Sequence, residues 1–348
     1  MHSGRISVPV KKCTPDLLRK NSWQTAKWLG QIIITLALLY VAGRKVDPLQ
    51  FWAYLRNFPV YFFILIPLIL VLDILINSWR VKSLYGYYGV TARLRDVFFI
   101  KFHGLFFSLA FPLLGDAYKI QSFKILNNAS YAKNTLVVLI DRLIYTFSLT
   151  LVLIPFWWLP VIKVPQAFKL ALLVLLAVEA LIILAINNVA LFNLSKKLAA
   201  KIGYRGALGH TEFAHREGYA RMIGINTVAA GLRHGLMGLM YLLICYTLMR
   251  QVNFHVWGFI AGVFSIMISR IIPVSVGGIG LREYVAVMVF PQTGISEELA
   301  FSTAFLMSSI LIIQGLLGGL SFLGWKMKDT RCRKNDPVES SDETDLYV

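Results

Sequence analysis

The chain has 348 residues, of which 57% are hydrophobic and only 15% charged, and its mean hydropathy is +0.64. This composition is too apolar for a water-soluble protein of such length. The alternating segments that are typical of an outer-membrane β-barrel are absent from the sequence, whereas long apolar runs are frequent. We therefore predict an all-α polytopic membrane protein without a soluble catalytic domain.

In chain order, about six apolar runs have the ~20-residue length that a spanning helix needs. They are residues 28–43, 60–79, 134–159, 168–192, 222–249 and 299–325. Two more apolar runs, 97–114 and 256–276, are interrupted near one end. No small-residue cleavage site follows the first run, so we expect that run to remain as an anchor.

These runs divide the chain into three parts. We predict a basic N-terminal arm (1–27), a single integral-membrane domain (28–325), and a tail (326–348) that is first basic, then acidic and disordered. The membrane domain itself is expected to consist of two halves, 28–160 and 168–325.

A formal net charge of +17 could indicate nucleic-acid binding, but the distribution of the charge argues against it. Basic residues gather in short stretches next to apolar runs, as the positive-inside bias requires. The stretches are 5–27, 80–95, 196–221 and 326–334. We expect all four in the cytoplasm, with both termini, in the inner (plasma) membrane, and we expect no nucleic-acid partner.

All four basic stretches can lie on the cytoplasmic side only if two further segments each begin and end on the same side of the membrane. These segments are 93–133 and 254–294, so each is predicted to be a hairpin, either re-entrant or a full pair of helices. Both contain residues that break helices, because Pro lacks a backbone donor and Gly permits tight turns. The expected tips contain Pro112 and Gly115 in the first hairpin, and Pro273, Gly277, Gly278 and Gly280 in the second.

We favour re-entrant hairpins because each second arm reads as only about 10 residues, or ~15 Å of helix. The order of elements along the chain is then helix, helix, hairpin, helix, and this order occurs once in each half. Three crossings per half invert the second copy relative to the first. Inverted repeats with broken helices are typical of alternating-access transporters.

The second tip also carries a family resemblance. Its string Gly-Gly-Ile-Gly-Leu-Arg-Glu (277–283), preceded by Pro273, resembles a signature of the lysylphosphatidylglycerol synthase transmembrane-domain family, often called flippase-like. Weaker resemblances to the same family are spread over residues 28–325; they are Pro112 with Gly115-Asp116 and Lys119, Asp141-Arg142-Leu143, and Trp79-Arg80.

The resemblance implies a membrane module that translocates a lipid or a lipid-linked glycan. Lysyltransferase members of the family add a large soluble aminoacyl-transfer domain. This chain resembles a stand-alone member instead, because its longest cytoplasmic insert, 195–221, is too short to fold as such a domain.

Ionisable residues inside apolar segments are costly and therefore point to function. We expect four cations, Arg233, Arg270, Arg282 and Lys119, to bind an anionic headgroup, and two carboxylates, Asp116 and Glu283, to balance charge or couple transport. Two alternatives stay open from the sequence. Arg233 can serve an internal ion pair, and Arg282 with Glu283 can lock the second hairpin.

Motifs for metal binding, for a serine nucleophile or for a phosphate loop are missing from the sequence. We therefore expect no metal, no cofactor and no enzymatic activity. The leading hypothesis is a translocator of an anionic or polyprenyl-linked membrane lipid. The alternatives are a non-transporting partner of a lipid or glycan synthase, and an integral-membrane lipid transferase; a homo-oligomer fits any of the three.

Overall fold

The computed structural model describes residues 33–44, 46–56, 62–110, 112–127, 129–158, 163–187, 218–248, 255–269 and 278–335, with residues 59 and 275. Three expected site residues, Arg270, Pro273 and Gly277, lie outside the described residues, as do the N-terminal arm and most of the 195–221 insert. The described residues form helices and no strand, so the prediction of an all-α polytopic membrane protein is confirmed.

Five of the described helices are long and apolar enough to cross a membrane. They are α3 (Phe62–Tyr87), α6 (Tyr131–Trp157), α7 (Gln166–Asn187), α9 (Tyr219–Leu248) and α12 (Glu297–Asn335). The first expected span is described only over Ile33–Gly43, which is too short by itself to cross. The basic stretch 326–334 continues α12, which ends at Asn335.

Helix α3 runs further than its apolar composition indicates. We expected it to end at residue 79, but it continues to Tyr87, and Gly89 just beyond it has a φ of +71°, which favours glycine. The amide of Val90 donates to the Tyr85 carbonyl (2.9 Å) and that of Gly89 to the Gly86 carbonyl (3.0 Å), the pattern of a Schellman motif. Arg80, expected in a cytoplasmic basic stretch, therefore lies inside a helix and is fully buried.

Two shorter helices, α4 (Leu94–Ala110) and α5 (Pro112–Asn127), form the first hairpin. Pro112 is the first residue of α5, a position where its missing amide hydrogen costs no helical bond. Gly115, expected at the tip, lies one turn inside α5, because its lack of a side chain lets α4 approach. A Cβ there would collide with Ser108 and would lie 2.7 Å from the Gly104 carbonyl oxygen. Helix α5 has 16 residues, more than the ~10 that its sequence pattern predicts.

The second hairpin consists of α10 (Val256–Ser269) and α11 (Leu281–Val289), which leads into a 3₁₀ turn, η2 (Phe290–Thr293). Gly278 and Gly280, expected near its tip, have φ of +79° and +83°, in the region that favours glycine. A Cβ on Gly280 would lie 2.7 Å from the Thr35 carbonyl oxygen, so this turn packs closely on the helix Ile33–Gly43.

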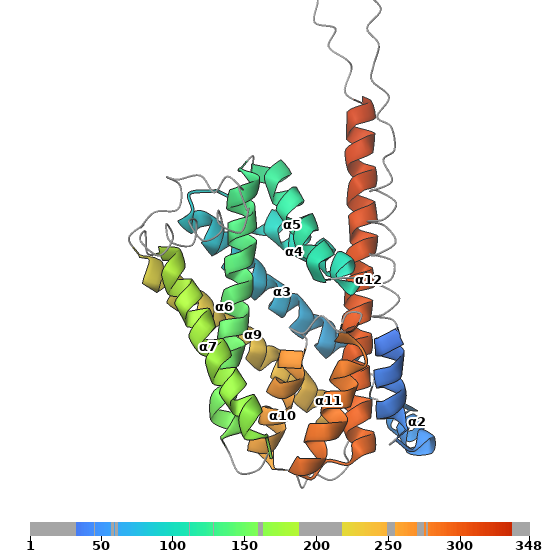
Figure 1. Cartoon of the computed structure of the whole chain (residues 1–348). Coiled ribbons are helices and arrows are strands. Elements are labelled where there is room, and N and C mark those ends of the chain that lie inside the picture. The colour runs from blue at the N-terminus through green and yellow to red at the C-terminus, as the bar shows by residue number, and fades with distance from the viewer. Residues whose placement is uncertain are drawn as a thin grey trace, which may run out of the picture.

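Figure 1 shows α12 along one side of the bundle, with α2 (Pro48–Arg56) beside it, and α6 and α7 on the other side. The first hairpin lies toward one end of the bundle and the second toward the opposite end. Helix α4 packs against α12, α10 packs against α6, and α3 packs against α9. The contact of α4 with α12 depends on three glycines of α12, Gly315, Gly318 and Gly319, where a Cβ would collide with α4.

The outer helices present apolar side chains to their surroundings, as a lipid environment requires. Helix α7 is the least buried of the five long helices, and it exposes Phe168, Leu170, Leu181 and Leu184. Buried polar and charged side chains lie between the helices instead, and about half of those in the described residues are on α3, α4, α5, α6 and α9.

Candidate functional site

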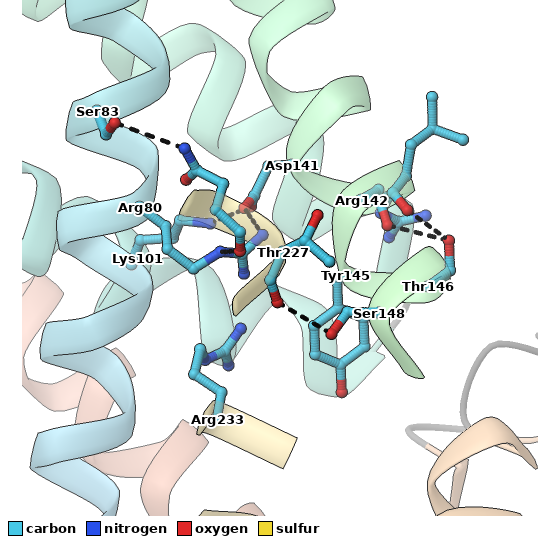
Figure 2. Close-up of polar contacts among 12 residues, drawn as sticks. Arg80, Ser83, Lys101, Asp141, Arg142, Tyr145, Thr146, Ser148, Thr227 and Arg233 are labelled. Atoms are coloured by element: carbon cyan, nitrogen blue, oxygen red, sulfur yellow. Dashed lines mark hydrogen bonds and ion pairs between the residues drawn. The ribbon is translucent and has the colours of Figure 1, made fainter. Parts of the chain in front are cut away.

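Helices α3, α4 and α6 meet at a cluster of three charged side chains, shown in Figure 2. The Nζ of Lys101 lies 2.6 Å from one carboxylate oxygen of Asp141, and the Nη2 of Arg80 lies 3.2 Å from the other. The Nε of Arg80 donates to the backbone carbonyl of Asn226 on α9 at 3.1 Å. Two cations thus share one carboxylate at a point where four helices converge.

A second ion pair joins α3 to α9. Arg233 binds Asp73 with two parallel hydrogen bonds, Nε to Oδ1 at 2.9 Å and Nη2 to Oδ2 at 3.0 Å. Both side chains are largely buried, and the guanidinium of Arg233 lies over the Tyr145 ring at 5.4 Å. This geometry supports the internal ion pair for Arg233, because the bidentate pair uses the Nε and Nη2 edge of its guanidinium.

A third group lies between α5 and α6. Asp116 accepts from Lys119 Nζ at 2.9 Å through one oxygen and contacts Arg142 Nε at 2.5 Å through the other. Arg142 is about half exposed, whereas Lys119 is mostly buried, at 16% side-chain exposure. The stem of Lys119 rests against Gly104 of α4, where a Cβ would lie 2.9 Å from Cε. The sequence predicted that Asp116 balances charge or couples transport, but it named neither Lys119 nor Arg142 as its partner.

These three groups together contain more positive than negative charge. Five cations face three carboxylates, an excess of two if all are ionised; the groups are Arg80, Lys101, Lys119, Arg142 and Arg233 with Asp73, Asp116 and Asp141. In water such an excess would be unremarkable. Arg142 is half exposed, but the other four cations are mostly or fully buried and still outnumber the three carboxylates by one. An uncompensated charge within an apolar bundle is costly, so the cluster is suited to hold an anion.

The first hairpin also places neutral polar groups in its contact with α12. The ring nitrogens of His103 lie 3.1 Å from the Tyr118 hydroxyl and 3.2 Å from the Ser321 hydroxyl. Phe107 stacks on Tyr118, with ring centroids 4.6 Å apart, and Phe322 meets both rings edge-on. This aromatic setting gives His103 a packing role between the first hairpin and α12.

In the second hairpin, Glu283 serves the local structure. Glu283 accepts from the Gly280 amide at 2.6 Å, which caps the first turn of α11, and its other oxygen accepts a very short hydrogen bond from Ser308 of α12. Arg282 is 3% exposed and its guanidinium packs on Gly278, where a Cβ would lie 3.2 Å from Nε. Both carboxylate oxygens of Glu283 are therefore engaged within the protein.

The structure thus brings some of the expected site residues together and separates others. Lys119, Asp116 and Arg233 belong to neighbouring charged groups among α3, α5, α6 and α9, whereas Arg282 and Glu283 lie at the other hairpin. Among the described residues, no group of three or more His, Cys, Asp or Glu side chains gathers as metal ligands.

The sequence interpretation did not single out Lys101, although a signal for it existed. Lys101 is the only Lys between Leu94 and Ala110, a helix whose other residues are mostly apolar or aromatic. A lysine in such a setting requires a buried partner, and Asp141, 40 residues further along the chain, provides it. Arg80 was interpreted only as a topology signal, because the helix was expected to end before it.

The comparison with protein families agrees with the resemblance at the second tip. The family described as the lysylphosphatidylglycerol synthase TM region matches residues 28–319. A search of curated proteins finds no match to this chain. The family match covers nearly all of the helical bundle, including both hairpins and each of the charged groups described above. The chain therefore belongs to the lysylphosphatidylglycerol synthase transmembrane family, and it is a membrane protein with a lipid-related context.

Proposed function

We propose that this chain is a translocator that moves an amphipathic, anionic or polyprenyl-linked lipid across the inner membrane. The observation that carries the proposal is the charged cluster among α3, α4, α5, α6 and α9, which has five cations and three carboxylates. Charges at membrane depth are retained where they handle a polar substrate or ion. A lipid could place its headgroup at this cluster while its tails stay in the bilayer.

The dimensions of the hairpins support a re-entrant arrangement. Helices α4, α5, α10 and α11 have 17, 16, 14 and 9 residues. At 1.5 Å per residue each is shorter than the ~30 Å hydrocarbon core, so neither hairpin has the length of two full crossings. Figure 1 has the two hairpins toward opposite ends of the bundle, as entry from opposite sides of the membrane requires.

Packing between the helices supports an inverted repeat. In an inverted repeat, α3, α4 and α6 of the first half would correspond to α9, α10 and α12 of the second. Each contact between two of these helices should then have a counterpart between the two corresponding helices. The contact of α4 with α12 then corresponds to that of α10 with α6, and the contact of α3 with α6 to that of α9 with α12; all four occur. Helix α3 packs on its own counterpart α9, as elements next to a two-fold axis do.

We assign the residues different roles within this proposal. Lys119 and Arg233 remain candidates for headgroup contact, together with Arg270, and Asp116 balances the charge of Lys119. Glu283 and Arg282 we assign to bracing the second hairpin, since Glu283 caps α11 and binds α12. Both termini face the cytoplasm in this proposal, because basic stretches flank the apolar runs on that side.

A transbilayer exchange assay tests the proposal. The purified chain is reconstituted in liposomes with headgroup-labelled phospholipid or polyprenyl-phosphate probes, and the fraction of probe accessible to an external quencher is followed over time. Exchange faster than in protein-free liposomes supports a translocator, and the probe class that exchanges identifies the substrate. If neither class exchanges, the chain is better described as a non-transporting partner of a lipid or glycan synthase.

A further inference from the structure

Arg80 is the most deeply buried cation of the cluster, with no exposed surface. Among the described residues, its Nε alone has a hydrogen bond, to the Asn226 carbonyl, and its Nη2 lies within ion-pair distance of Asp141. In the described part of the chain, Nη1 has no hydrogen-bond partner. A guanidinium with five donors therefore offers unused donors in the interior of the protein.

Lys101 lies on the other side of the same carboxylate. Its Nζ makes one contact, with Asp141 at 2.6 Å, and an ammonium group has three donors. Figure 2 shows Arg80 and Lys101 both directed at Asp141, with Arg233 extending toward them from below. Because Arg233 is neutralised by Asp73, the three groups Arg80, Lys101 and Asp141 keep one positive charge in excess.

An excess buried cation with unused donors is stable when a negatively charged group binds beside it. We propose that Arg80 and Lys101 form a binding site for a phosphate group, in which Asp141 is the resident anion that the phosphate displaces or joins. Phosphate suits this pair because the planar fork of Arg binds two of its oxygens while Lys supplies a point charge. The phosphate belongs either to a lipid headgroup or to free inorganic phosphate.

Asp141 gives this site a means of release. A bound phosphate brings its own negative charge close to the carboxylate, so the two anions compete for the same donors. Removal of the carboxylate should therefore tighten phosphate binding and slow its release. This role in transport rests on the proposed function, whereas phosphate binding itself does not depend on it.

The test measures thermal unfolding of the full purified chain in an uncharged maltoside detergent. The additives are sodium phosphate and dioctanoyl phosphatidylglycerol, with sodium chloride at equal ionic strength and dioctanoylglycerol as phosphate-free controls. A ligand that binds only the folded state raises the unfolding temperature, and the rise grows with the logarithm of the ligand concentration divided by its dissociation constant. We expect the phosphate-bearing additives to raise it by several degrees more than their controls.

Three variants locate the effect. Lys101→Met removes one donor and should weaken phosphate binding on the order of tenfold or more, so most of the temperature shift is lost. Lys124→Met is the matched control, because Lys124 lies on α5 of the same hairpin and contacts the Tyr131 ring instead. Asp141→Asn removes the competing anion, so its stability should depend on phosphate more strongly than that of the wild type.

A shift with both phosphate-bearing additives supports recognition of the phosphate itself, and a shift with the lipid alone supports a headgroup site. The proposal is overturned if neither phosphate-bearing additive raises the unfolding temperature of the wild type more than its control does. It is also overturned if the rise is as large in Lys101→Met as in Lys124→Met. If Lys101→Met does not fold, an Asp141→Asn response no larger than that of the wild type contradicts the proposal. Phosphate binding without lipid exchange would contradict the proposed translocator and support the phosphate site. Lipid exchange without phosphate binding would support the translocator and contradict the phosphate site.

Discussion

The two hairpins of this protein have the same layout but different chemistry. In the first, α4 and α5 contribute Lys101, Asp116 and Lys119, and two of these reach charged partners on α6. In the second, α10 is buried along most of its length by apolar and small side chains. Glu283 of α11 is used locally, for a helix cap and for a link to α12.

This difference indicates that the halves of a repeat need not share a function. The second hairpin has the more recognisable sequence motif, yet its conspicuous Glu283 has both oxygens occupied by structural hydrogen bonds. The first hairpin has weaker motifs, but it borders an excess of buried positive charge. We infer that the second hairpin braces the bundle and the first provides the site.

The largest expected effect comes from breaking the ion pair of Asp73 with Arg233. Arg233→Gln leaves a buried carboxylate without its partner, and we expect a loss of ~3–5 kcal/mol in the free energy of unfolding. Chemical denaturation in detergent measures it. The double variant Asp73→Asn/Arg233→Gln should recover a substantial part of the loss, whereas a double variant as unstable as the single one would argue against a simple pair.

The next effect tests the second hairpin as a brace. Glu283→Ala removes the cap of α11 and the acceptor of Ser308, so we expect a loss of about 2–3 kcal/mol. Glu283→Gln keeps an acceptor for the Gly280 amide and should lose much less. Thermal unfolding of the two variants side by side measures the difference, and equal losses would indicate that the charge, not the cap, matters.

A smaller effect is expected where the arms of the first hairpin touch. Gly115→Ala forces a Cβ toward Ser108 and the Gly104 carbonyl oxygen, so α4 and α5 must separate, at a cost of ~1–3 kcal/mol. Gly224→Ala is a matched control, because a Cβ at Gly224 of α9 meets nothing within 4 Å. Urea titration of both variants checks the contrast, and a Gly115→Ala variant as stable as Gly224→Ala would contradict the close packing.

The smallest effect concerns the contact of the first hairpin with α12. Ser321→Ala removes one hydrogen-bond partner of His103, while Tyr118 remains. We expect a loss of ~1 kcal/mol in stability and little change in lipid exchange. Thermal unfolding measures the first and the liposome assay the second. A large loss of exchange with normal stability would instead give His103 a role in transport.

The sequence predicted the elements of this fold better than their ends. Hydropathy located the long helices, but it placed the end of α3 at residue 79, where the apolar run stops. The turn chemistry at Gly89 marks the true end, and a composition argument does not use it. That error assigned Arg80 to the aqueous side and hid its part in the site.

The pairing of charges was beyond what sequence patterns alone specify. Asp73 and Arg233 are 160 residues apart, and Arg80 reaches a carbonyl on α9 that is 146 residues away. Such partners are chosen by the packing of α3 against α9, which depends on the whole bundle. A single sequence could name costly buried charges, as it did for Arg233 and Asp116, but it could not say which of them meet.

The most direct test of the account compares lipid exchange between variants of the two hairpins, each first shown to be folded. Lys101→Met changes the first hairpin, Glu283→Gln changes the second, and Lys124→Met controls for loss of a lysine outside the cluster. The account predicts that Lys101→Met loses exchange in liposomes while the other two keep it. Loss of exchange in Glu283→Gln, with exchange retained in Lys101→Met, would contradict it and place the site at the second hairpin.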